Sequence, residues 1–349
     1  MKVYFDSIRV TKRVPLKISR GINAGSENIW LRIEADGVEG WGEASPFSIG
    51  NYSQTLDDIV SDLQVACRGL YDLHPFQRNA IEQKLFTLNV GRAARAAIDT
   101  ALYDWLGKRV GFPLWKLLGL ESRARVPTSV TIGISSPIEA EARLRAWLAQ
   151  TDVRVVKVKL GSSEGIQADQ AMFEAVFRGL PPGVQVSVDA NGGWNLSDAK
   201  TMASWLAERG VMYLEQPLQI SQEAFLVELY QESSLPIFVD ESCFCSSDIP
   251  QLAPYIQGIN IKLMKSGGLQ EALRMIHTAR AHGLKVMFGC YSNTSLGNTA
   301  MAHLASLADY LDLDSHLNLQ NDPFLGATLK NGILILNNQP GIGLTYHGV

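Results

Sequence analysis

Two patterns of hydrophobic and polar positions divide the chain. Residues 2–16 and 28–43 alternate apolar and polar side chains, which predicts strands with one buried face and a turn at Asp36-Gly37. Helical patterns follow, with Ser53 as a candidate N-cap and an Ala- and Leu-rich amphipathic stretch at 91–108. The sequence therefore predicts a small α+β domain over residues 1–120.

From about Val126 the pattern becomes regular, with short β-branched runs separated by helical stretches. Strands are predicted at 153–160, 184–189, 211–215, 237–240, 259–262, 285–288 and 310–313. Helices are predicted between several of them, at 197–209, 221–232, 269–282 and 295–307. Alternation of this kind implies parallel strands joined by right-handed crossovers.

The spacing of the strand ends indicates which parallel fold is formed. Asp189, Glu215, Asp240, Lys262 and Phe288 follow one another at 215 − 189 = 26, 240 − 215 = 25, 262 − 240 = 22 and 288 − 262 = 26 residues. That period predicts an α/β fold, a TIM-like (β/α) barrel over residues 121–325. The alternative is an open doubly wound sheet, but no Gly-x-Gly-x-x-Gly motif follows a strand.

The tail at 326–349 has a strand-like segment at 332–336 with no helix to accompany it. We expect this tail to return to the N-terminal region and complete a capping domain.

Composition narrows the classes of partner. The chain is 46% hydrophobic and 19% charged, with 31 basic and 35 acidic residues, so no nucleic-acid partner is expected. No apolar run is long enough to span a bilayer, and charge comes too early for a signal peptide, so we expect no membrane partner.

Four cysteines form no disulfide framework, and Cys243-Phe244-Cys245 has no second metal-binding pair. Reduced thiols in a cytoplasmic protein are the simpler interpretation.

Nearly every predicted barrel strand from the second onward ends in charged residues. A single aspartate there is often only an N-cap for the next helix. Three carboxylates at one barrel mouth would repel one another unless a cation lies between them, and hard oxygen ligands suit Mg²⁺. The candidate residues are Lys157, Lys159, Asp189, Glu215, Asp240, Lys262, Asp312 and Asp314.

The lysines then acquire a chemical role. Lys157 and Lys159 are two apart on one strand, so both point to the same face. A neighbouring ammonium and a divalent cation would favour the neutral, basic form of Lys159. Lys262 approaches from the sixth strand, across the barrel. One lysine could remove a proton and the other return one, while Mg²⁺ stabilises an enediolate, which is an epimerisation geometry.

Six segments together resemble the enolase superfamily, muconate-lactonizing subgroup. They are Trp41-Gly-Glu43, Lys157-Val-Lys159, Asp189-Ala-Asn191, Glu215-Gln-Pro217, Asp240-Glu-Ser242 and the run from Asn260 through Lys262 and Lys265 to Gly268. The superfamily is known for pairing a lysine base with Mg²⁺.

The resemblance assigns roles residue by residue. It implies Asp189, Glu215 and Asp240 as Mg²⁺ ligands and Lys159 and Lys262 as the acid/base pair. It also implies Lys157 as an auxiliary cation near the substrate carboxylate, Lys265 as a supporting residue, Asn191 as a substrate contact, and a cap built from both chain termini.

The segment Asp312-Leu313-Asp314 resembles the Asp-x-Asp of dipeptide epimerases, where the pair holds the substrate α-ammonium group. The alternative is a loop in which Asp314 caps its own backbone.

The segment around Cys290 departs from the epimerase pattern. Arg20 lies one place from a side-chain-binding arginine, so it could contact a substrate acid group or only pair with a neighbouring carboxylate. Loops at 17–28 and 47–52 resemble the two specificity loops.

The sequence therefore predicts an isomerase, most like a dipeptide epimerase, that acts on a dipeptide or N-acyl amino acid carboxylate. The alternatives are an o-succinylbenzoate synthase, an N-succinylamino acid racemase or a muconate-type cycloisomerase. A non-catalytic metal-binding protein is a distant third, because a fold alone proves no chemistry. The resemblance also allows a homo-oligomer.

Overall fold

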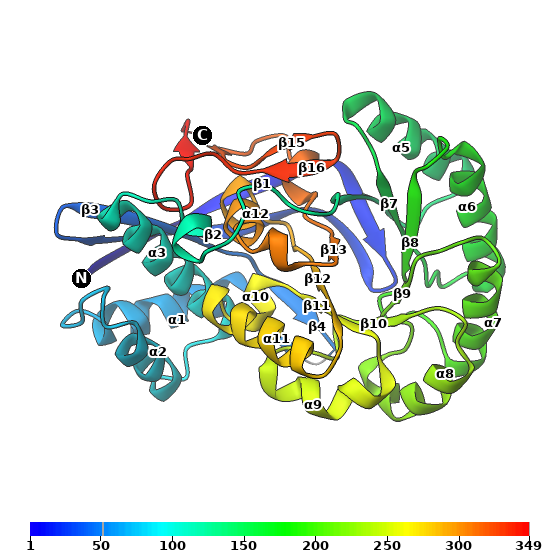
Figure 1. The fold of residues 1–349 in the computed structure, drawn as a ribbon, viewed down its shortest axis with the longest axis horizontal. Helices are drawn as coiled ribbons and strands as arrows, with labels where there is room; N and C mark the ends of the chain where they lie inside the picture. Colours follow the sequence, from blue (N-terminus) through cyan, green and yellow to red (C-terminus); the bar gives the residue numbers. More distant parts are fainter. Residues whose placement is uncertain (51, 349) are drawn as a thin grey trace.

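The N-terminal region folds around a three-stranded antiparallel sheet (Figure 1). The computed structural model describes residues 1–50 and 52–348. The sheet has the order β1-β2-β3, with bounds β1 Lys2–Ile18, β2 Gly21–Ala35 and β3 Val38–Ala44. Asp36 and Gly37 both have positive φ, at 52° and 71°, and form the predicted turn between β2 and β3.

Four helices follow the sheet and pack on it or on one another. They are α1 Leu56–Gly69, α2 Arg78–Thr87, α3 Arg92–Val110 and α4 Leu114–Leu117, preceded by the hairpin β4 Phe47–Ile49 and β5 Tyr52–Gln54. Helices α1 and α3 pack on the sheet, α2 packs on α1, and α4 packs on α3. Helix α3 lies directly on β3, where a Cβ at Gly42 would come within 1.9 Å of the Ala97 carbonyl oxygen. Only glycine permits this close packing.

The predicted N-cap at Ser53 is wrong. Ser53 lies within β5, and Thr55 caps α1 by accepting a hydrogen bond from the Asp58 amide. The Asp58 carboxylate accepts from the Thr55 amide in return, at 2.8 Å. This reciprocal capping box satisfies two backbone donors, which Ser53 could not reach from an extended strand.

Eight parallel strands form the predicted barrel. In order they are β6 Ser129–Ile132, β7 Val155–Lys159, β8 Gln185–Asp189, β9 Leu214–Glu215, β10 Ile237–Val239, β11 Gly258–Ile261, β12 Lys285–Phe288 and β13 Tyr310–Leu311. A parallel bridge between Thr128 and Leu311 joins the first strand region to the last. The sheet is therefore nearly closed.

Helices surround the barrel. They are α5 Pro137–Gln150, α6 Ile166–Gly179, α7 Leu196–Ala207, α8 Leu226–Glu232, α9 Ile249–Leu252, α10 Leu263–Ser266, α11 Leu269–Ala281 and α12 Ser295–Ala302. Two predicted helices differ. Residues 220–225 form a 3₁₀ segment ahead of α8, and α12 ends at Ala302 before a separate 3₁₀ turn. None of the described helices is long and apolar enough to cross a membrane.

The C-terminal tail contacts both parts of the molecule. Its strands are β14 Phe324–Leu325, β15 Thr328–Lys330, β16 Ile333–Ile335 and β17 Thr345–Tyr346. Tyr346 stacks on Trp30 of the cap, with ring centroids 5.2 Å apart, and the Thr128 amide donates to the Gly332 carbonyl.

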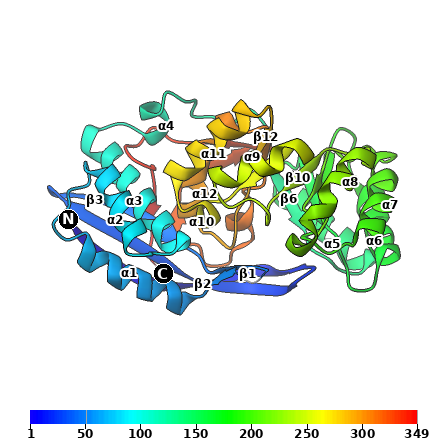
Figure 2. The same ribbon diagram turned by 90° about the horizontal axis from the view of Figure 1, so that it is seen from below.

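The β1–β2 hairpin extends from the cap to the barrel, as Figure 2 shows from below. The Lys17 carbonyl accepts from the Ile134 amide at 2.8 Å, just beyond β6. The cap therefore covers the ends of the barrel strands from which functional side chains project.

Candidate active site

A cavity of about 1150 Å³ lies between the cap hairpin and the mouth of the barrel. Both parts contribute to its wall, including Arg20 and Phe47 from the cap and Lys159, Lys262 and Asp314 from the barrel. Its size is that of a small-molecule site.

The three predicted metal ligands stand on adjacent strands. Asp189 pairs in register with Glu215, Asp240 directly follows the next strand, and all three side chains are buried. Burial, with the nearby charges of Asp189 and Asp240, raises the pKa of Glu215 to about 7. A cation would relieve this repulsion.

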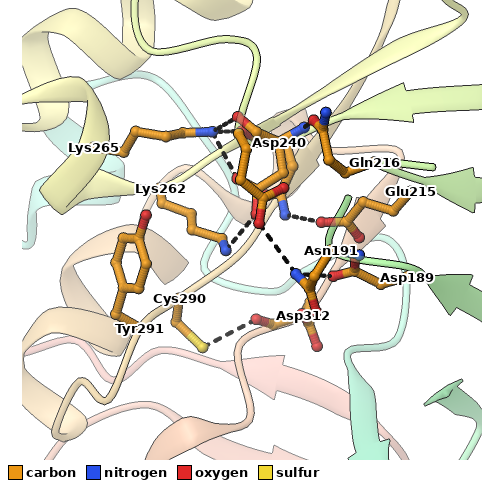
Figure 3. Close-up of polar contacts among 12 residues, drawn as sticks. Asp189, Asn191, Glu215, Gln216, Asp240, Lys262, Lys265, Cys290, Tyr291 and Asp312 are labelled. Atoms are coloured by element: carbon orange, nitrogen blue, oxygen red, sulfur yellow. Dashed lines mark hydrogen bonds and ion pairs between the residues drawn. The ribbon is translucent and has the colours of Figure 1, made fainter. Parts of the chain in front are cut away.

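Ammonium groups lie against these carboxylates (Figure 3). Lys159 Nζ lies 2.5 Å from Asp189 Oδ2, and Lys262 Nζ lies 2.6 Å from Asp240 Oδ2. Lys265 Nζ donates to Asp240 Oδ1 at 2.7 Å and to the Asn260 carbonyl at 2.9 Å. Lys265 is fully buried, so it holds Asp240 in place rather than meeting a substrate.

The donor set fits Mg²⁺, although the three carboxylates are paired with lysines here. Within residues 1–50 and 52–348, no three His, Cys, Asp or Glu side chains converge closely enough to hold an ion as they stand. Glu215 Oε2 receives no hydrogen bond of good geometry, although Lys157 Nζ lies 2.6 Å away. Three mutually repelling buried carboxylates with such an oxygen offer the hard ligands that Mg²⁺ prefers.

Lys159 and Lys262 face each other across the cavity. Lys159 is the last residue of β7 and Lys262 directly follows β11. These strands are four places apart in the eight-strand order, and both lysines line the cavity. Burial alone would lower the pKa of Lys262, but the Asp240 carboxylate, helped by Tyr291, raises it. Lys262 Nζ also lies 4.7 Å from the centroid of the Tyr291 ring. In this arrangement Lys262 is a proton donor.

Lys157 lies beneath the cavity. Its side chain has no exposed surface, and its Nζ is 2.6 Å from Glu215, 2.7 Å from Asp312 and 3.4 Å from Asp189. These carboxylates hold the pKa of Lys157 well above its usual value, against the opposing effect of burial. From this position Lys157 supports the carboxylates, and its place near the substrate carboxylate stays a prediction.

Asp312 and Asp314 differ in how fully they are engaged. Asp312 accepts from Lys157 and Ser129, both at 2.7 Å, and its pKa falls to about 2 because these contacts outweigh burial. Asp314 Oδ2 accepts from the Thr131 amide at 2.7 Å, and among the described residues no lysine or arginine lies within ion-pair distance of its carboxylate. Burial and the charge of Asp312 raise the pKa of Asp314 to about 6. Asp314 is therefore the freer acceptor for an ammonium group.

Arg20 pairs with a neighbouring carboxylate, as one of its two predicted roles requires, and also lines the cavity. Its Nη1 lies 2.7 Å from Glu241 Oε1 and donates to the Asn191 carbonyl at 2.9 Å. Asn191 itself donates to Asp189 and Glu241, both at 3.2 Å. Arg20 thus ties the cap hairpin to residues that follow β8 and β10, with its charge already balanced by Glu241.

The wall near Lys262 is aromatic. Phe47 stacks on Tyr291 with ring centroids 5.0 Å apart. Cys290 Sγ lies 3.2 Å from the Asp312 carbonyl, and all four cysteines are free. The predicted loop at 47–52 includes residue 51, which lies outside the described residues.

Sequence reasoning assigned no role to several site residues. Asn260 donates to Glu215 at 2.7 Å, and Glu241 pairs with Arg20. Asn260 and Glu241 lie within longer sequence motifs, in which neither was given a role. Lys12 is buried in the cavity wall. The sequence could have indicated that Lys12 is buried, because it lies two residues after Val10 on an alternating strand and so faces the same side.

Comparison with known proteins gives consistent matches along the chain. Residues 1–119 match the family model "Mandelate racemase / muconate lactonizing enzyme, N-terminal domain", and residues 139–348 match "Enolase C-terminal domain-like". The chain is 45% identical over 345 residues to the hydrophobic dipeptide epimerase of Roseobacter litoralis, covering 98% of both chains.

Two solved structures are similar over almost their whole length. A substrate-liganded L-Ala-D/L-Glu epimerase from Bacillus subtilis has a TM-score of 0.93 and 29% identity, with complete coverage of both chains. A dipeptide epimerase from Enterococcus faecalis V583, complexed with Mg and L-Leu-L-Tyr, has a TM-score of 0.91 and 29% identity, with 99% coverage of both.

Proposed function

The chain belongs to the mandelate racemase/muconate lactonizing enzyme family of the enolase superfamily, and from that membership we propose that it is a Mg²⁺-dependent dipeptide epimerase. One observation carries the proposal: Lys159 and Lys262 lie on opposite walls of the cavity, and Asp314, whose carboxylate has no cationic partner among the described residues, lies in the same cavity. Two lysines serve the two faces of one carbon, and Asp314 suits a free α-ammonium group.

The reaction inverts the carbon beside the dipeptide carboxylate. One lysine removes the α-proton from one face, and the other delivers a proton to the opposite face. Lys262, protonated in its pair with Asp240, suits the delivering role for one stereoisomer. Mg²⁺ held by Asp189, Glu215 and Asp240 would stabilise the enediolate charge.

The remaining site residues position the substrate. Asp314, supported by Asp312, receives the α-ammonium group, while Asn191 lies at the barrel mouth beside Asp189. Because Glu241 already balances Arg20, the site near Arg20 does not favour an acidic side chain. Phe47 and Tyr291 offer an apolar surface near Lys262, which suits a hydrophobic C-terminal residue. The names of the relatives, which include hydrophobic dipeptide epimerases, support this choice.

The test is incubation of a dipeptide library in D₂O with Mg²⁺, followed by mass spectrometry. We expect deuterium at the α-position of the C-terminal residue, greatest for hydrophobic residues. Exchange of N-succinylamino acids, with no exchange of any dipeptide, would refute the proposal and favour the racemase or synthase alternative.

A further inference from the structure

Lys12 is a buried cation in the cavity wall that the proposed reaction does not use. It lies on β1 of the cap, is 7% exposed, and lines the cavity together with Asn23 and Ser292. Its Nζ donates to Asn23 Oδ1 at 2.7 Å and to Ser292 Oγ. Among the described residues, no carboxylate lies within ion-pair distance of it, and Asn23 and Ser292 are the side chains that accept from its Nζ.

A buried ammonium in this state is poorly compensated. Burial lowers the pKa of Lys12 to about 8, opposed only by the more distant Cys290 and Asp314. Two neutral acceptors do not replace the hydration of a full positive charge, so an incoming anion would be favoured here.

The position of Lys12 tells which part of a dipeptide would meet it. Asp314 is the group proposed to hold the α-ammonium, and it directly precedes the 3₁₀ turn Ser315–Asn318. Lys12 forms an antiparallel bridge with Leu319, at the end of that turn. Arg143 donates to Asn318 at 3.0 Å in the same wall. Lys12 therefore lies near the group proposed to hold the α-ammonium, which places it beside the N-terminal residue of a bound dipeptide.

We propose that Lys12, with Asn23 and Ser292, binds the carboxylate side chain of an acidic N-terminal residue. This inference rests on the proposed dipeptide epimerase function. The preferred substrate class is an L-Glu or L-Asp residue followed by a hydrophobic residue, because Arg20 is already balanced by Glu241 and the stacked rings of Phe47 and Tyr291 offer an apolar surface near Lys262. The ligand carboxylate accepts the third Lys12 Nζ–H, as a charge-assisted hydrogen bond.

The test compares three dipeptides: L-Glu-L-Leu, its neutral isostere L-Gln-L-Leu, and L-Leu-L-Leu. Deuterium entry at the leucine α-position gives kcat/KM for each. We expect L-Glu-L-Leu to exceed L-Gln-L-Leu by about tenfold, the range of a hydrogen bond between charged groups. In Lys12→Met the ratio falls to about one, whereas in Lys17→Met, which removes another cavity-lining lysine, it is unchanged.

A pH profile of wild type separates charge recognition from a structural tie. The Glu/Gln ratio should fall as pH rises through about 8, because Lys12 loses its proton there. The substrate α-amino group titrates in the same range but is common to both dipeptides, so it cancels in the ratio. This measurement decides the matter even if Lys12→Met fails to fold.

Two outcomes overturn the inference: equal rates for L-Glu-L-Leu and L-Gln-L-Leu in wild type, or a Glu/Gln ratio that survives in Lys12→Met. Exchange of L-Leu-L-Leu without a preference for glutamate refutes only the role of Lys12. Absence of exchange with every dipeptide refutes the proposed function itself.

Discussion

Replacing Lys157 by methionine removes the cation that lies among three buried carboxylates. Its Nζ contacts Glu215 at 2.6 Å and Asp312 at 2.7 Å, and its side chain is fully buried. Methionine has a similar shape but no charge, so Glu215 and Asp312 would lose their contact with a buried cation. Breaking a buried ion pair by removing one partner costs about 3–5 kcal/mol of unfolding free energy.

The chain offers a matched control on its surface. Lys200 Nζ also lies between two carboxylates, at 2.5 Å from Glu228 and 2.7 Å from Glu232, with its side chain 24% exposed and the two glutamates 51% and 54% exposed. Solvent screens that pair, so Lys200→Met should cost less than about 1 kcal/mol.

Urea unfolding at pH 7, followed by circular dichroism, measures both variants. We expect Lys157→Met to lose several times more unfolding free energy than Lys200→Met, at unchanged m-value. Equal losses in the two variants would refute the reasoning that Lys157 is needed to compensate these carboxylates.

Three further predictions follow from other parts of the molecule. Asp314→Asn should lower kcat/KM for dipeptides, with a loss of about 2–3 kcal/mol of transition-state stabilisation, because the α-ammonium loses a charged acceptor. Steady-state kinetics measure this loss, and an unchanged kcat/KM would exclude Asp314 from the ammonium site. Adding Mg²⁺ at a hundred times its wild-type Kd should raise the unfolding free energy by about 2.7 kcal/mol in wild type but not in Glu215→Gln. Urea unfolding measures this change, and equal stabilisation of the two proteins by Mg²⁺ would exclude Glu215 as a ligand. His303 is buried, with the Trp115 amide donating to its Nδ1 and Nε2 facing the Ile342 carbonyl, and burial lowers its pKa to about 4. Below pH 6.5 the unfolded chain binds a proton at His303 that the folded chain does not bind, so the unfolding free energy should fall by about 2 kcal/mol between pH 7 and 5. His303→Gln should remove that part of the pH dependence. Parallel curves of unfolding free energy against pH for the two proteins would contradict the assignment.

The barrel could be predicted from sequence because its period is local and repetitive. Each strand ends in a charged residue at a nearly constant spacing, and parallel strands bring those ends to one face. The exact strands were shorter than predicted, as at β9, where only Leu214–Glu215 pair. Apolar runs continue beyond the hydrogen-bonded ladder, so hydrophobicity alone does not mark its ends.

Contacts between distant segments were harder to predict. Lys157 and Lys159 have the same periodicity, yet one is sealed beneath the carboxylates and the other faces the cavity. The roles of Lys12 and Glu241 depend on the β1–β2 hairpin meeting the barrel mouth. No local pattern in sequence encodes that meeting, because it is set by how the cap docks on the barrel.

The most direct test of two-base chemistry is isotope exchange with each lysine removed in turn. Lys159→Ala and Lys262→Ala are each incubated with both epimers of one accepted dipeptide in D₂O and Mg²⁺, and chiral separation precedes mass spectrometry. The account predicts that neither variant epimerises, and that each incorporates deuterium into only one epimer, a different one for each variant. Epimerisation at the wild-type rate in either variant, or exchange of both epimers by both variants, would contradict the assignment of Lys159 and Lys262.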